Sequence, residues 1–311
     1  MKKILKVVFV LFIFCEFLFA QENFPKNGIS ENFKPTYAFK NANIIISPNE
    51  QIKNGVLIIK DDIIINVDSN LEIPENAITF DLQGDYIYPS FIDLFSDYGL
   101  SKVERKNTGY APQYESNKKG AYSWNQAIHP EIHASQQFFH DRKKMKGYHE
   151  MGYGALLTHV SDGIFRGSGC FVVLADNKEN EDIILEKAAT FYSFNKGTSN
   201  QRYPTSLMGS IALIKQTLLD SEWHENSNEN TNISLTEYNR YKNLPKIFDV
   251  NSYLDYSRLF KISDEFEIDY IAKGNGYEFL RIEEIKQTNF PIIVPINFTL
   301  LFLNFRCISR F

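Results

Sequence analysis

One histidine stands where a side chain can take part in chemistry. His159 ends an apolar run that begins at Ala155, and such a run is typical of a buried β-strand. Side chains at strand ends commonly belong to binding sites, because the rigid sheet holds them beside the loops that meet a ligand. Imidazole is also a common metal ligand. His159 is therefore the first candidate site residue.

A glycine-rich segment, residues 161–169, follows this histidine directly. Within it, Arg166, Gly167 and Gly169 predict a loop in which a guanidinium and backbone N–H groups converge on an anion or another small ligand. The alternative is a plain glycine-rich turn that leads into a strand at 170–174. The residues alone leave both interpretations open.

The neighbouring histidines are weaker candidates. His129 and His133 are four residues apart, so on a helix they would share one face. Pro130 between them favours a helix start, and we expect both histidines to face solvent. His140 and His149 stand among Lys and Arg residues, a setting that disfavours a bound cation.

Composition and motifs exclude several classes of function. The 311 residues carry a formal net charge of -5 and no long basic run, which argues against a nucleic-acid partner. The sequence has no phosphate-binding loop, dinucleotide-binding glycine pattern or nucleophile elbow. Cys170 and Cys307 are too far apart for a paired-cysteine zinc motif, so we expect two unpaired buried thiols.

Residues 1–20 predict a cleaved export signal. A basic start at residues 1–3 precedes an apolar run at 7–14, and Ala20 resembles a cleavage point. Cys15 suggests a lipoprotein instead, although the residues before it are large. An uncleaved anchor is a further alternative, but the segment is short for a membrane span. We expect a periplasmic or secreted protein with no membrane span after cleavage.

The elements that must position these residues are of two kinds, and the first is all-β. Residues 36–88 alternate short β-branched runs with turn residues, which predicts a small β part that we assign to residues 21–85. Asp61 and Asp62 lie between two apolar runs and predict a tight hairpin.

From residue 86 the pattern changes to strands that alternate with helices. Ser252 and Asp255 have the spacing of a capping box, and Leu259 and Ile262 share one face of the helix that follows. Strand–helix–strand spacing implies parallel pairing through right-handed crossovers. We expect strands at 155–159, 246–249, 268–272 and 291–295, helices within 131–149 and at 208–219, 252–266 and 277–287, and an exposed polar loop at 222–231.

Three segments together resemble the metal-dependent amidohydrolases, in particular the imidazolonepropionase-like members. They are Leu82–Asp93, where an apolar β segment passes into Pro-Ser-Phe-Ile-Asp, then Gly152–Thr158 and Asp249–Pro295. The resemblance implies an α/β fold, with a partial N-terminal β-sandwich followed by an incomplete TIM-like (β/α) barrel over residues 86–298.

The resemblance also implies where a metal would bind. In that family, two histidines separated by one residue end the first barrel strand, so both reach one zinc-type ion that converts bound water into hydroxide. The matching positions in this chain are Phe95 and Asp97, and later ligand positions match Asp249 and Gly274. Neither phenylalanine nor glycine can hold a metal through its side chain. Asp93, in the same motif, is expected to support a local turn.

The length predicts an incomplete barrel. From Pro89 onward the chain is shorter than the roughly 250 residues of a typical eight-stranded barrel, and it contains large insertions. We interpret this as the loss of the family's closing strands through C-terminal truncation. Residues 299–311 are apolar without a clear period. A frameshift or premature stop would explain them, and a short apolar strand or helix is the alternative.

Two hypotheses of function follow. The first is an exported, degenerate amidohydrolase relative that needs no cofactor and lacks hydrolase activity, and that either binds a small molecule or an envelope protein or is a fragment without function. The second is an active hydrolase of non-peptide C–N bonds, in which Asp97, His159 and Asp249 hold zinc or another divalent metal.

Overall fold

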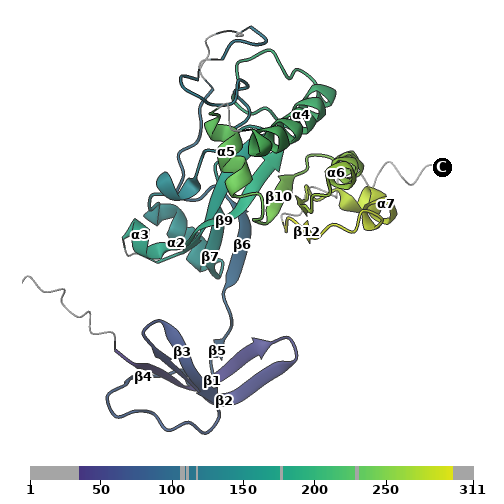
Figure 1. Cartoon of the computed structure of the whole chain (residues 1–311). Coiled ribbons are helices and arrows are strands. Elements are labelled where there is room, and N and C mark those ends of the chain that lie inside the picture. The colour runs from purple at the N-terminus through teal and green to yellow at the C-terminus, as the bar shows by residue number, and fades with distance from the viewer. Residues whose placement is uncertain are drawn as a thin grey trace, which may run out of the picture. The chain divides into compact units, whose positions relative to one another are not determined.

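The structure is a computed structural model that describes residues 35–296, except 106–108, 110–111, 117, 176–177 and 228–230. The predicted export signal and the tail at 299–311 lie outside the described residues. The chain divides into two compact units, one ending at Pro89 and the other beginning at Ser90 (Figure 1). This boundary falls a few residues beyond the predicted one at 85.

The first unit is a single five-stranded sheet. Its strand order is β3-β2-β1-β4, and β5 also pairs with β1. Asp61 and Asp62 connect β2 to β3 with φ values of 52° and 63°, which is the geometry of the predicted tight hairpin. The strands are β1 (Tyr37–Ser47), β2 (Glu50–Lys60), β3 (Ile63–Asp68), β4 (Ile78–Asp81) and β5 (Tyr86–Ile87).

The second unit is built on a seven-stranded sheet in the order β12-β11-β10-β9-β8-β7-β6, a mixed α/β fold whose sheet forms a nearly closed barrel. β9, β10, β11 and β12 pair in parallel, and so do β6 and β7. The strands are β6 (Phe91–Ser96), β7 (Tyr153–Thr158), β8 (Phe165–Val173), β9 (Ile183–Ser193), β10 (Lys246–Asp249), β11 (Ile271–Lys273) and β12 (Ile292–Ile293).

The helices of this unit lie between the strands, as the alternating pattern predicts. Figure 1 shows α4 and α5 lying together, with α6 and α7 beside β10 and β12. None of the described helices is both long and apolar enough to cross a membrane. The helices are η1 (Ala134–Gln136), α2 (Arg142–Glu150), α3 (Glu179–Asp182), α4 (Leu207–Asn226), α5 (Ile233–Arg240), α6 (Tyr253–Phe266), η2 (Glu278–Arg281) and α7 (Ile282–Lys286).

The direction of β8 differs from a simple strand–helix alternation. β8 is antiparallel to both β7 and β9. The connection from β7 to β8 is only a few residues long, and the one from β8 to β9 contains only the short α3. Short connections join antiparallel strands, because a parallel pair needs a crossover of a dozen or more residues. The sequence pattern did not predict this reversal.

The predicted anion loop at 161–169 is largely strand, so that interpretation of its shape is wrong. Arg166, Gly167 and Gly169 lie within β8. Gly167 has φ +78°, and a Cβ there would stand 1.9 Å from the carbonyl oxygen of Ile132. A Cβ on Gly169 would stand 2.5 Å from the Phe191 ring. These glycines allow neighbouring chain segments to approach β8 closely.

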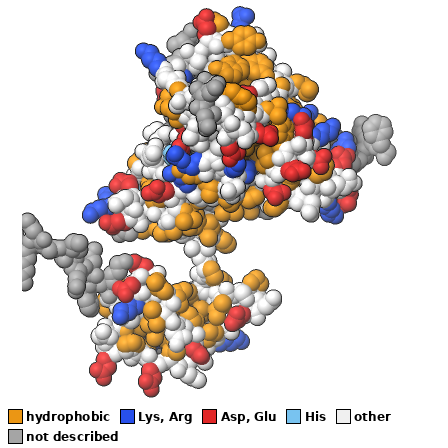
Figure 2. Space-filling model, viewed as in Figure 1, with side chains coloured by type: hydrophobic (Ala, Val, Ile, Leu, Met, Phe, Trp, Pro, Cys, Tyr) orange, Lys and Arg blue, Asp and Glu red, His pale blue; other side chains and the backbone are white. Residues whose placement is uncertain are grey.

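The predicted amphipathic helix is confirmed as α6. The Ser252 side chain accepts a hydrogen bond from the Leu254 N–H at 3.3 Å, and the Asp255 carboxylate accepts one from Asn251. Leu259 is fully buried against the sheet. α4 extends to Asn226, so the first part of the loop expected at 222–231 is helical. Large apolar side chains also reach the surface of this unit, among charged ones of both signs (Figure 2).

Replacing Leu259 with alanine should lower the free energy of unfolding by about 2 to 5 kcal/mol, because it leaves a cavity in a closely packed core. Leu254 lies on the same helix and is 41% exposed, so Leu254→Ala is the matched control and should change it by less than about 1 kcal/mol. Urea unfolding of both variants measures the difference. Equal losses would contradict the assigned burial of the helix faces.

Candidate functional site

A buried group of charges occupies the C-terminal ends of β10 and β11. Asp249 is the last residue of β10 and Lys273 is the last residue of β11. Arg166 reaches from β8 and places Nη1 at 3.1 Å from Asp249 Oδ2, and Lys273 Nζ lies 3.5 Å from Asp249 Oδ1. We call these three residues the charge cluster. Active sites of barrel folds lie at this end of the strands.

An aromatic stack lies beside the charge cluster. The His159 imidazole is parallel to the Phe191 ring, with centroids 3.8 Å apart and an interplanar angle of 4°. Phe95 contacts the same imidazole at a centroid distance of 4.4 Å. Lys273 Nζ lies 4.8 Å from the centroid of the Phe95 ring, a cation–π contact. We call Phe95, His159 and Phe191 the aromatic stack.

His159 is held as a neutral ring. It is 1% exposed, and neither ring nitrogen has a hydrogen-bond partner among the described residues. Burial lowers the pKa of His159 well below its usual value, and the positive charges of Arg166 and Lys273 lower it further. The nearby carbonyl of Ser96 acts in the opposite direction without forming a hydrogen bond to the ring.

Arg166 is the deepest of the charges. It is 6% exposed, and its Nε donates to the Gly163 carbonyl at 3.3 Å. Burial lowers the pKa of Arg166, and Asp249 opposes this effect. A guanidinium remains protonated in proteins, so the cluster holds two positive charges and one negative charge. Both oxygens of the Asp249 carboxylate face a cation that belongs to the protein itself.

These residues do not fit a divalent metal ion. A metal at Asp249 would have to displace Arg166 or Lys273, which already pair with both of its carboxylate oxygens. Among the described residues, no three His, Cys, Asp or Glu side chains converge closely enough to hold a metal. Asp97 is exposed, whereas His159 is enclosed. The structure gives no support to the metal site built from Asp97, His159 and Asp249, which stays a prediction.

The motif at the end of β6 has a local structural role. Asp93 Oδ1 accepts a hydrogen bond from the Phe95 N–H at 3.0 Å, which is the turn support expected of it. Ser96 Oγ accepts from the Tyr98 N–H at 3.1 Å. Together these bonds shape the end of β6 and orient the Phe95 ring toward His159.

The expectation that His129 and His133 face solvent is wrong. His133 is 7% exposed, with Nδ1 at 2.8 Å from Ser168 Oγ and Nε2 at 3.1 Å from Glu237 Oε2. Burial, together with the charge of Lys118, lowers the pKa of His129 to about 4. The error arose because Pro130 starts no helix, and the segment instead passes along β8.

The Ser168–His133–Glu237 chain has the residue types of a hydrolytic triad, although Ser168 contacts Nδ1 rather than Nε2. Ser168 is 2% exposed, and the cavity beside it measures only about 10 Å³, room for at most one water molecule. A nucleophile needs space for its substrate. We therefore assign this chain a structural role that ties β8 to α5.

Two features escaped the sequence reasoning. Lys273 stands next to Gly274, the expected ligand position, and its presence was the available signal that a lysine ammonium group pairs with Asp249 there. The contacts of Ser168 with His133 and Glu237 join residues far apart in the chain, and no local pattern marks them.

Neutralising Asp249 should destabilise the fold, because Asp249→Asn leaves the buried Arg166 without its counter-charge. We expect a loss of about 3 kcal/mol or more in the free energy of unfolding. Asp97→Asn removes the same charge from an exposed position and should change it by less than about 0.5 kcal/mol. Urea unfolding measures both, and a small effect of Asp249→Asn would contradict the buried pairing.

Acid sensitivity should depend on His159. Its pKa is lower in the folded protein than in the unfolded chain, so the unfolded chain takes up a proton first. The stability that the neutral ring contributes is complete above pH 6.5 and is lost as the pH falls toward the lowered pKa. His159→Phe keeps an aromatic ring in the stack and cannot be protonated. Its urea midpoint should therefore fall less than that of the natural chain between pH 6.5 and 4, and parallel profiles would contradict this assignment.

Comparisons with known proteins bear on the fold. No protein-family model matches the chain, and no curated protein matches it in sequence. It is similar to a solved amidohydrolase from Thermotoga maritima MSB8, with a TM-score of 0.67 and 16% identity over 84% of this chain and 70% of that one. An uncharacterized protein has a TM-score of 0.37 at 11% identity, covering 83% and 78% of the two chains.

A second amidohydrolase has a TM-score of 0.34 at 9% identity, covering 83% of this chain and 77% of that one. TM-scores this low carry no argument. The first similarity shows that this chain has a fold similar to that of a solved amidohydrolase, and at 16% identity it shows the fold alone.

Proposed function

We propose that this chain is an amidohydrolase relative that has lost metal-dependent hydrolysis and acts as a non-catalytic binding protein. The observation that carries the proposal is the charge cluster. At the strand ends where a barrel hydrolase needs open metal coordination, Arg166 and Lys273 neutralise Asp249.

The aromatic stack supports the same proposal. A histidine that binds a metal presents a free nitrogen to the ion, and a second group orients its other nitrogen. His159 has no orienting partner among the described residues, and it is packed flat against Phe191. Phe95 fills space beside it and contributes no ligand atom.

The cellular setting of the proposal rests on the sequence. Residues 1–20 have the pattern of an export signal, so we propose that the protein works in the periplasm or outside the cell. Its partner would be a small molecule or an envelope protein, and it would need no metal cofactor.

Metal content tests the proposal directly. After gentle purification of the full chain, elemental analysis should find fewer than about a tenth of an equivalent of zinc, iron or manganese, because Asp249 is already paired with Arg166 and Lys273. Excess zinc should likewise leave the thermal midpoint unchanged, since no site in the folded state binds it.

The alternative active hydrolase gives a different result. It would retain close to one equivalent of metal, and Asp97→Asn would release that metal without unfolding the protein, because Asp97 is exposed. That outcome, together with hydrolysis of a C–N bond that a chelator stops, would overturn the proposal.

A further inference from the structure

A large pocket lies at the opposite ends of the strands from the charge cluster. It measures about 610 Å³, a volume typical of small-molecule sites. Lys246, which begins β10, and Asp269, which precedes β11, both line it. The last residue of β10, Asp249, belongs to the charge cluster. The three residue steps from Lys246 to Asp249 separate the two sites by roughly 10 Å along the strand.

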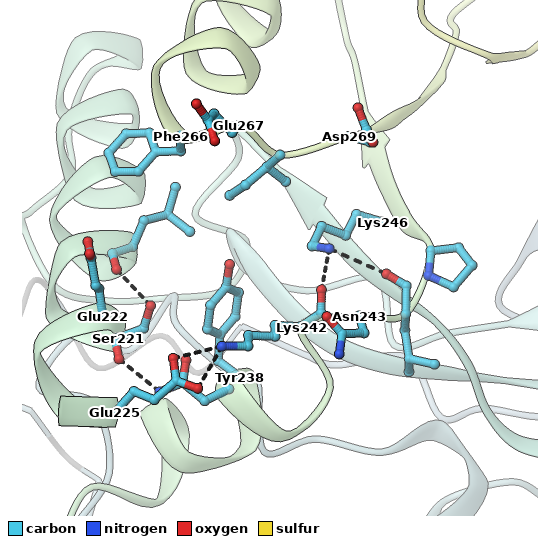
Figure 3. Close-up of a pocket in the computed structure, with 15 residues that line it drawn as sticks. Ser221, Glu222, Glu225, Tyr238, Lys242, Asn243, Lys246, Phe266, Glu267 and Asp269 are labelled. Carbon is cyan, nitrogen blue, oxygen red and sulfur yellow. Dashed lines mark hydrogen bonds and ion pairs between the residues drawn. The ribbon is translucent and has the colours of Figure 1, made fainter.

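Tyr238 is a nearly buried side chain whose hydroxyl reaches this pocket. It is 9% exposed, and no described residue forms a hydrogen bond with its hydroxyl, which keeps some contact with solvent. Figure 3 shows its hydroxyl pointing away from Lys242, toward the side where Phe266 and Glu267 lie. Burial raises the pKa of Tyr238 to about 12, so the hydroxyl is neutral at ordinary pH. A ligand that enters the pocket can therefore replace solvent as the hydrogen-bond partner of this hydroxyl.

The charges around the pocket favour a cation. Its rim carries four carboxylates and two ammonium groups: Glu222, Glu225, Glu267, Asp269, Lys242 and Lys246. Both ammonium groups are already engaged. Lys242 pairs with the Glu225 carboxylate at 2.6 Å, and Lys246 donates to the backbone carbonyls of Lys242 and Leu244 (Figure 3).

The other three carboxylates are open to a ligand, and among them Asp269 lies near enough to Lys246 to raise the pKa of its ammonium group. Glu222, Glu267 and Asp269 are exposed, and their carboxylates form no ion pair among the described residues (Figure 3). Glu267 is held at the pocket by a left-handed backbone, φ 52°, which ends α6. An incoming ammonium group would therefore meet unpaired negative charge beside the Tyr238 oxygen, which can accept its proton in a hydrogen bond.

Part of the remaining wall is apolar. Leu218 of α4, the Phe266 ring of α6 and Ile268 line the same space. Such walls suit the hydrocarbon or aromatic body of a ligand, while the rim suits its charged head. A bare metal ion has no apolar part to occupy these walls. Among the described residues, no group of three His, Cys, Asp or Glu side chains could hold one.

We infer that this pocket binds a small organic cation, a protonated amine on an apolar aromatic body. Its ammonium group donates to Tyr238 and faces Glu267 and Asp269, and its body packs on Leu218, Phe266 and Ile268. This site is independent of the charge cluster and of whether the protein hydrolyses anything.

Three probes that share one ring system test the inference. Tryptamine carries an ammonium group, tryptophol a hydroxyl and indole-3-acetate a carboxylate. Calorimetric titration of the full chain should show tryptamine binding at least about tenfold more tightly than either analogue, and the affinity should fall as salt is added. No tryptamine binding up to about 1 mM, or equal affinity for the three probes, would overturn the inference.

Single substitutions test whether tryptamine binds in this pocket. Tyr238→Phe removes only the hydroxyl and should weaken tryptamine binding about tenfold, the effect of one hydrogen bond to a charged group. Tyr241→Phe is the matched control, because Tyr241 lies outside this pocket, and it should leave the affinity unchanged. An unchanged affinity in Tyr238→Phe would overturn the assignment of the site.

A second variant distinguishes a loss of binding from a loss of folding. Glu267→Gln combined with Asp269→Asn alters only exposed side chains and should weaken binding about threefold. Thermal midpoints equal to that of the natural chain verify that the variants are folded. If this folded double variant binds tryptamine as well as the natural chain does, the inference fails.

Discussion

The ion pair between Arg166 and Asp249 determines the chemical character of the strand ends in the second unit. The two residues come from β8 and β10, and β9 lies between those strands, so the guanidinium spans a neighbouring strand to reach the carboxylate. Charges this deeply buried are tolerated only when they are paired and hydrogen-bonded. The pair therefore constrains the register of β8, and it places positive charge where a barrel hydrolase would need ligands for a cation.

The segment at 128–133, which precedes η1, packs along the same strand, β8. Ile128 and His133 form bridges to Phe165 and Ser168 of β8, and His133 continues the contact to Glu237 of α5. Gly167 is what permits this close approach, because any larger residue would collide with the carbonyl of Ile132. This stretch, whose histidines were expected to face solvent, is thus packed into the unit, and its histidines are withdrawn from solvent.

The two ends of the parallel strands have opposite chemistry. The C-terminal ends carry a net positive cluster closed by aromatic rings, whereas the N-terminal ends of β10 and β11 border an acidic pocket with an unpartnered tyrosine hydroxyl. The chemistry at one end does not decide what the other end binds, because the αβ connections that build the second pocket do not contain the charge cluster. The fold similarity to a solved amidohydrolase is accordingly a guide to architecture, and the sites must be judged from their own residues.

The sequence by itself determined the elements that depend on local patterns. Strand 246–249 and helix 252–266 were predictable because apolar periodicity and a serine cap act over a few residues. Asp61 and Asp62 likewise specified a hairpin. The absence of histidine at position 95 was also visible without a structure. The tertiary structure alone decided the direction of β8, the burial of His133, and the meeting of Arg166, Asp249 and Lys273. Those features join residues that are distant in the chain, and the free energy of pairing buried charges depends on positions that only the packed sheet defines.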